Sequence, residues 1–284
     1  MKKKIGFIDL HIDEWHANNY PGWIVNSRCK GDFELGFAWE ESPAPGGKNL
    51  RKWCEDFNMT PALSIEEVIE KSDAICVLAP SNPETHERLA DLPLQSGKPL
   101  FIDKPFAPGR AAAKRIIQKA EAYHTPLLSS SALRFCAEFP AVRTDVMHGE
   151  PPLHVVTTGG GSNFDEYAIH QLEMIVSMLG VGAQNIMCTG NDAASHLVIS
   201  YSDHRSAALS YHPGFIFTTS VVSANYGQAG IAGSGFFEGL IDHMLTFFQS
   251  GISPVPGEET EEIAALLECA IAARKTPLTP VGII

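Results

Sequence analysis

The sequence has 284 residues, which is enough for two domains or for one large one. Its 44% hydrophobic and 19% charged residues are typical of a globular protein that buries a core. The formal net charge of -12 argues against nucleic acid or an anionic membrane surface as the main partner, because both require a basic face.

The first ten residues, MKKKIGFIDL, have a basic start but only a short apolar run, and no apolar run approaches the length of a membrane span. We therefore expect no signal peptide and no membrane span, and a cytoplasmic protein. The six cysteines are spread singly without a C-x-x-C pair, so they predict buried thiols of a reducing compartment rather than a zinc or redox motif.

The first half of the chain alternates short apolar runs with longer amphipathic stretches. Helices are expected over 49–57, over 65–71, where Ser64 and Glu67 form a capping box, and over 109–124. The alternation predicts an α/β fold with a doubly wound parallel sheet, in a Rossmann-like domain over 1–130. The expected strands, continuous apolar runs that suit burial on both faces, are 5–10, 34–40, 74–80, 99–105 and 126–135.

The pattern changes after about residue 150. A helix over 165–179 is followed by alternating segments without helices between them, which predicts a mostly antiparallel open sheet in a second α/β domain over 131–284. Two helices, 236–251 and 258–275, close the chain. The alternating segments are 185–190, 195–202, 207–212 and 215–226.

A strand that ends in Asp103-Lys104-Pro105 places Lys104 at the carboxyl edge of the parallel sheet, where open α/β sheets bind ligands. Pro105 holds the chain extended there. At this point the sequence resembles the glucose–fructose oxidoreductase / inositol dehydrogenase (Gfo/Idh/MocA) family, which carries Glu-Lys-Pro at the corresponding place. The segments 79–86 (APSNPETH) and 131–135 (SALRF) also resemble segments of that family.

The segment 160–180 is similar to the family's Gly-Gly-x-x-x-x-Asp-x-x-x-His-x-x-Asp helix. The resemblance implies that Lys104 and His170 serve acid–base chemistry at a sugar or polyol hydroxyl while hydride passes to NAD or NADP. Glu166, four residues before His170 and on the same helical face, would orient it, and Glu173 takes the place of the second acid. Candidate substrate-binding residues are Arg134, Asn163 and Tyr167.

The first strand is not followed by the G-x-G-x-x-G turn that a dinucleotide fold uses to approach the pyrophosphate. Asp9, His11 and Glu14 fall at the three glycine positions, and Asp13 and Glu14 bring negative charge to the start of the next helix. The candidate cofactor-binding residues are nevertheless Asp9, His11, Ile12, Glu40, Ala79, Pro80, Asn82, His86, Asp103 and Lys104.

Other interpretations of this acidic turn stay open. Asp9, His11, Asp13 and His16 have metal-ligand chemistry but no standard spacing, so no metal site is predicted. The same region could line a sugar pocket or belong to a helix and its core; the residues concerned are Trp15, Asn18, Asn19 and Tyr20.

Two functions therefore remain. The first is an NAD(P)-dependent oxidoreductase that acts on a sugar-like substrate. The second is a family member that binds no dinucleotide, as a regulatory or binding protein or as a non-redox lyase or isomerase. In either case the resemblance implies a homodimer or homotetramer built on the exposed face of the second sheet.

Overall fold

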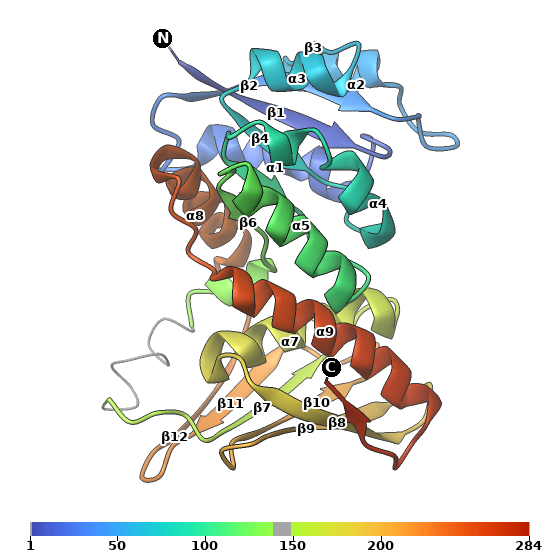
Figure 1. Cartoon of the computed structure of the whole chain (residues 1–284), viewed down its shortest axis with the longest axis vertical. Helices are drawn as coiled ribbons and strands as arrows, with labels where there is room; N and C mark the ends of the chain where they lie inside the picture. Colours follow the sequence, from blue (N-terminus) through green and yellow to red (C-terminus); the bar gives the residue numbers. More distant parts are fainter. Residues whose placement is uncertain (1, 139–148, 284) are drawn as a thin grey trace. The chain divides into compact units, whose positions relative to one another are not determined.

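The computed structural model describes residues 2–138 and 149–283, which divide into two compact units. Unit 1 comprises the chain up to Ser130 together with Leu240–Gly257, and unit 2 comprises Ser131–Gly239 and Glu258–Ile284. Each unit is built on one sheet flanked by helices (Figure 1). The predicted α/β class, with a parallel sheet followed by a second, mostly antiparallel sheet, is confirmed.

The sheet of unit 1 has six strands in the order β3-β2-β1-β4-β5-β6, and all its pairings are parallel. The order reverses between β1 and β4, so the carboxyl ends of these strands flank the point where a doubly wound sheet binds its ligands. The strands are β1 (Lys3–Asp9), β2 (Phe33–Glu40), β3 (Thr60–Pro61), β4 (Ala74–Val77), β5 (Leu100–Ile102) and β6 (Leu127–Leu128).

Helices connect these strands and cover the sheet. In the view of Figure 1, α2 and α3 lie above β1 and β2, whereas α1 and α8 lie below them. Close packing explains Gly6 in β1, because a Cβ atom there would lie 2.5 Å from Val68 Cγ1 in α3. The helices are α1 (Trp15–Asn26), α2 (Leu50–Phe57), α3 (Ile65–Lys71), α4 (Pro83–Leu89), α5 (Arg110–Ala122) and α8 (Phe236–Ser250), with a 3₁₀ turn η1 (Pro93–Gln95).

The sheet of unit 2 has the order β12-β11-β7-β10-β9-β8-β13, in which β7 and β10 are parallel and the other described pairings are antiparallel. Helices α7 and α9 pack on one face of this sheet and form the core with it. The elements are η2 (Ala132–Phe135), β7 (His154–Gly159), α7 (Phe164–Leu179), β8 (Ala183–Gly190), β9 (Ser195–Tyr201), β10 (Ser206–Tyr211), β11 (Thr218–Val222), β12 (Gly227–Ile231), α9 (Gly257–Lys275) and β13 (Val281–Gly282).

Several expected strands are shorter in the structure, most of all 126–135 and 215–226. The run 126–135 forms a strand only over Leu127–Leu128, because Ser131 caps the 3₁₀ turn η2 by accepting the N–H of Leu133. The run 215–226 forms β11 only, and Ser223 then opens a hairpin turn by donating its N–H to the carbonyl of Tyr226. No helix in the described part of the chain is both long and apolar enough to cross a membrane.

Candidate active site at the carboxyl edge of the parallel sheet

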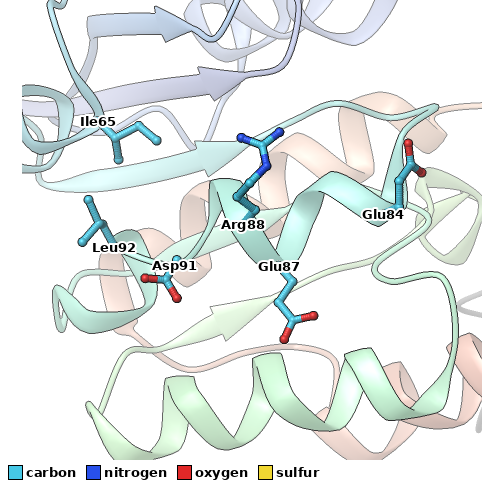
Figure 2. A pocket seen from close by; sticks show the side chains of 6 residues that line it. All are labelled: Ile65, Glu84, Glu87, Arg88, Asp91 and Leu92. Carbon is cyan, nitrogen blue, oxygen red and sulfur yellow. The ribbon is translucent and has the colours of Figure 1, made fainter.

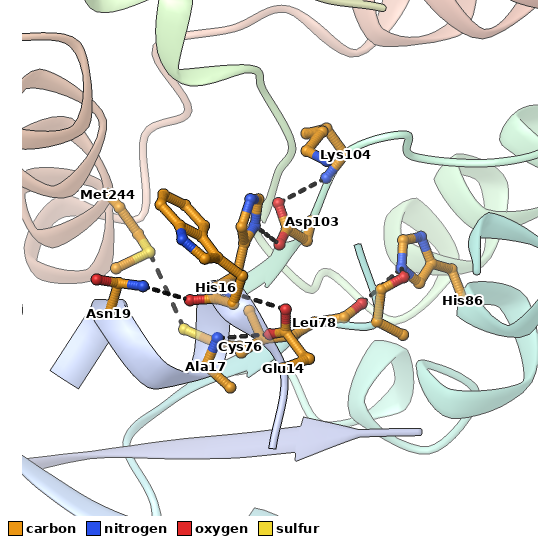
Figure 3. Close-up of polar contacts among 12 residues, drawn as sticks. Glu14, His16, Ala17, Asn19, Cys76, Leu78, His86, Asp103, Lys104 and Met244 are labelled. Carbon is orange, nitrogen blue, oxygen red and sulfur yellow. Dashed lines mark hydrogen bonds and ion pairs between the residues drawn. The ribbon is translucent and has the colours of Figure 1, made fainter. Parts of the chain in front are cut away.

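Asp103 and Lys104 directly follow β5, at the carboxyl edge of the sheet, as the sequence predicts. Asp103 is fully buried, and its Oδ1 atom accepts the backbone N–H of Lys104 at 2.7 Å. Its Oδ2 atom contacts Nδ1 of His16 in α1 (Figure 3). This His16–Asp103 pair was not predicted, because 87 residues separate its members in the sequence.

Burial alone would raise the pKa of Asp103, but the charge and hydrogen bond of His16, together with Lys104, hold it below its ordinary value. Asp103 is therefore a carboxylate at neutral pH. The His16 ring stacks on the ring of Tyr20, with 5.4 Å between the centroids. Burial, and then the Asp103 carboxylate, raise the pKa of Tyr20 well above its ordinary value, so this phenol stays neutral.

The acidic turn between β1 and α1 is closed by Glu14, which is the N-cap of α1. Its carboxylate accepts the backbone N–H of His16 at 2.7 Å and also that of Ala17 (Figure 3). These donors belong to the first turn of the helix, where N–H groups have no partner within the helix. Burial raises the pKa of Glu14 to about 7, although His16 opposes this shift.

Glu40, which ends β2, points both of its carboxylate oxygens at backbone donors. Oε2 accepts the N–H of Ile12 at 3.0 Å, and Oε1 accepts the N–H of Leu50 at 2.8 Å. Asp13 makes a second link of the same kind, because its Oδ2 atom accepts the N–H of Lys48 at 2.8 Å. These bonds tie the loop before α2 to the turn after β1.

Asp9, the last residue of β1, is buried beneath this turn. Its Oδ1 atom accepts the N–H of His11 at 3.2 Å, whereas its Oδ2 atom has no hydrogen-bond partner among the described residues. Burial, and then the charge of Glu14, raise the pKa of Asp9 well above its ordinary value. The imidazole of His11 turns outward and reaches the carbonyl oxygen of Ser42 with Nδ1, at 2.7 Å.

The remaining candidates in unit 1 follow β4. Ala79 has a left-handed backbone (φ 63°), and Pro80 leads on to Asn82, the residue before α4. His86 is fully buried, and its Nδ1 atom lies 3.1 Å from the carbonyl oxygen of Phe106. Burial lowers the pKa of His86, which makes it a neutral link between loops.

The residues of α1 that were considered as an alternative sugar pocket mostly contact other parts of the protein. Asn18 donates to Asp13 Oδ1 and accepts from Trp53 Nε1, each at 2.9 Å. Asn19 donates to the carbonyl of Trp15, and Tyr20 is fully buried. Trp15 is the exposed member of this set.

In unit 2, His170 lies on the second turn of α7. Its Nδ1 atom is 2.7 Å from Ser131 Oγ, and its ring meets those of Tyr167 and Phe217 edge to face, with centroids 5.7 and 5.6 Å away. Asn163 caps the helix by accepting the N–H of Glu166 at 2.9 Å. Sequence reasoning missed Ser131, although it begins the SALRF segment.

Arg134 is buried between two carboxylates of unit 2. Nε contacts Glu173 Oε1, and Nη1 lies 2.7 Å from Glu259 Oε2. Burial would lower the pKa of Arg134, but both carboxylates raise it, so the guanidinium keeps its charge. These contacts give Arg134 and Glu173 a structural role in addition to any part they play in substrate binding.

An open pocket lies beside α4, away from the β5 edge. Figure 2 shows Arg88 and Glu87 pointing to opposite sides of this helix. The pocket is lined by Ile65, Glu84, Glu87, Arg88, Asp91 and Leu92. Within residues 2–138 and 149–283, no three or more His, Cys, Asp or Glu side chains are arranged to hold a metal ion.

Residues 43–130 match the model of an oxidoreductase family with an NAD-binding Rossmann fold, Gfo/Idh/MocA. The resemblance to this family is thereby confirmed, and the match begins after the acidic turn. No curated protein sequence matches the chain.

Solved structures share the fold over nearly the whole chain. Myo-inositol dehydrogenase from Lactobacillus casei, in complex with NAD(H) and myo-inositol, is 14% identical with a TM-score of 0.84, covering 100% of this chain and 97% of that one. A probable dehydrogenase from Thermotoga maritima is 16% identical with a TM-score of 0.80, covering 99% and 98%. UDP-N-acetylglucosamine 3-dehydrogenase from Acidithiobacillus ferrooxidans is 14% identical with a TM-score of 0.78, covering 98% of each chain.

Proposed function

We propose that this member of the oxidoreductase family acts on a sugar-like small molecule, with Lys104 and His170 as its acid–base residues. The observation that carries the proposal is Lys104 itself, which follows a buried, ionised Asp103 at the carboxyl edge of the parallel sheet. An ammonium group there would polarise a hydroxyl or carbonyl oxygen of the substrate.

The surroundings of His170 support its proposed role as an acid–base residue. The hydroxyl of Ser131 holds Nδ1, and two aromatic rings flank the imidazole, so the ring has a fixed orientation. A histidine held at one nitrogen can exchange a proton with substrate through the other, which is what a general acid or base requires. Glu166 and Tyr167 are proposed to contribute to the same substrate site, by their positions one turn before His170.

A dinucleotide does not fit the start of α1, which is where its pyrophosphate would bind. Its pyrophosphate would need the N–H groups at the start of α1, two of which Glu14 already satisfies, and its ribose would need Glu40, each of whose oxygens already accepts one backbone N–H. We therefore favour a proton-transfer reaction of the isomerase or lyase class over hydride transfer. The family match supports the NAD(P)-dependent alternative, which stays open to test.

The test is an NMR assay in D₂O with a panel of inositols, keto-inositols, aldoses and ketoses, each with and without NAD⁺ or NADP⁺. We expect deuterium uptake or a changed product without cofactor. Lys104→Met should abolish turnover and leave the melting temperature within a few degrees, and Lys71→Met, at an exposed position, should change neither. Unchanged turnover in Lys104→Met would contradict the role of Lys104, and turnover only with a cofactor would restore the dehydrogenase alternative.

A further inference from the structure

The start of α1 would be an anion site if its donors were open. Helix α1 has 12 residues and follows β1, so its first N–H groups lie at the carboxyl edge of the sheet beside the point where the strand order reverses. Unpaired N–H groups and the helix dipole together attract a phosphate at such a place. In doubly wound folds this is where a dinucleotide pyrophosphate binds.

Glu14 fills that place with a carboxylate of the chain itself. One oxygen accepts the N–H of His16 and the other accepts the N–H of Ala17, so a single side chain makes the bidentate contact that a phosphate would make. Because the carboxylate is tethered as the N-cap, its effective concentration at these donors exceeds that of any free anion.

Two further acidic residues near the turn strengthen this exclusion. Asp9 is buried next to it with one oxygen unpartnered among the described residues, and the charges of Glu14 and Asp9 influence each other. The charge of Asp103, which His16 keeps ionised, also raises the pKa of Glu14. A diphosphate brought to the His16 and Ala17 donors would have to displace the Glu14 carboxyl group and approach the Asp103 carboxylate.

We propose that Glu14 is an internal substitute for the cofactor phosphate, and that this one side chain keeps pyrophosphate-containing ligands from the start of α1. The proposal concerns Glu14 alone and is independent of the roles of Lys104 and His170. A shorter, uncharged residue at position 14 would reopen the site while keeping the helix capped.

The variants Glu14→Ser and Glu14→Asn test this, because Ser and Asn are good N-caps without a charge. Glu14→Gln is the matched control, since it removes the charge but keeps the length of the side chain and one oxygen that can accept an N–H group. Binding of inorganic pyrophosphate, ADP-ribose and NADH is measured by calorimetry, with circular dichroism as the check of folding.

We expect no saturation of the wild type up to about millimolar ligand, little change in Glu14→Gln, and at least about tenfold tighter binding of all three ligands in a folded Glu14→Ser or Glu14→Asn. In the wild type, adding pyrophosphate should leave the amide NMR signals of His16 and Ala17 unmoved, a measurement that needs no variant. Saturable movement of these signals, micromolar binding of NADH by the wild type, or a folded short-chain variant that binds no better would each overturn the proposal. Failure of the Lys104 assay would leave these outcomes unaffected.

Discussion

Arg134 and Arg28 show how strongly the surroundings of a charged residue affect its contribution to stability. Both form ion pairs, but the Arg134 side chain is 2% exposed and that of Arg28 is 86% exposed. Water screens the Arg28–Asp242 pair, whereas Arg134 and its carboxylates have given up their hydration and depend on one another. The same contrast separates Glu14, held by two N–H groups, from the exposed acids that give the chain most of its net charge.

Arg134→Met should therefore destabilise the protein by about 3 to 5 kcal/mol, because it leaves the buried Glu173 and the partly buried Glu259 without a cation. Arg28→Met should leave the free energy of unfolding nearly unchanged, because water screens this exposed pair. Urea denaturation followed by circular dichroism measures both. Equal losses in the two variants would show that the Arg134 cluster is solvated.

Among the elements, α7 is the one on which the proposed chemistry of unit 2 depends. Its N-terminus is set by Asn163, whose side chain accepts the N–H of Glu166, and its apolar face is buried against the mixed sheet. The cap fixes where the first turn begins, and thereby the direction in which the side chain of His170 projects from the helix.

Asn163→Ala should cost about 1 kcal/mol of stability through loss of the cap, and Asn163→Asp should restore it, because aspartate caps as well as asparagine does. If the cap also positions His170, turnover of the substrate should fall in Asn163→Ala and recover in Asn163→Asp. Thermal unfolding and the NMR assay measure the two effects separately. A variant Asn163→Ala as stable as the wild type would show that packing alone fixes the helix.

For the whole molecule, the buried acids of unit 1 set how stability depends on pH. Burial raises the pKa of Glu14 from 4.5 to about 7 and also raises that of Asp9. Between pH 4.5 and 7 the unfolded chain has released these protons while the folded chain still holds them, so the folded state binds more protons and stability falls as pH rises. The lowered pKa of Asp103 has the opposite effect on stability, but only at pH values below about 3.8, the ordinary pKa of an aspartate.

We therefore expect the free energy of unfolding to fall between pH 5 and pH 8, with about 1 to 3 kcal/mol of that fall due to Glu14. Glu14→Gln should flatten the curve, and Glu70→Gln, at an exposed position, should leave its slope unchanged. Denaturation at a series of pH values measures this. A wild-type curve that rises from pH 5 to pH 8 would contradict the assignment of a raised pKa to Glu14.

The fold class follows from the sequence, because continuous apolar runs and helical periodicity depend on local pattern. The same pattern places Lys104 at the end of a strand and Glu166 and His170 one turn apart. It also identified Asp9, His11 and Glu14 as the replacements for the glycines. The contacts that these three residues make follow from the three-dimensional fold. Some contacts form only when distant strands and loops come together. Examples are the pairing of His16 with Asp103 and the bond from the N–H of Ile12 to Glu40. The capping of α1 by Glu14 likewise depends on the conformation of the turn that precedes the helix. Hydrogen-bond satisfaction in a buried site is a property of three-dimensional neighbours, which sequence spacing does not specify.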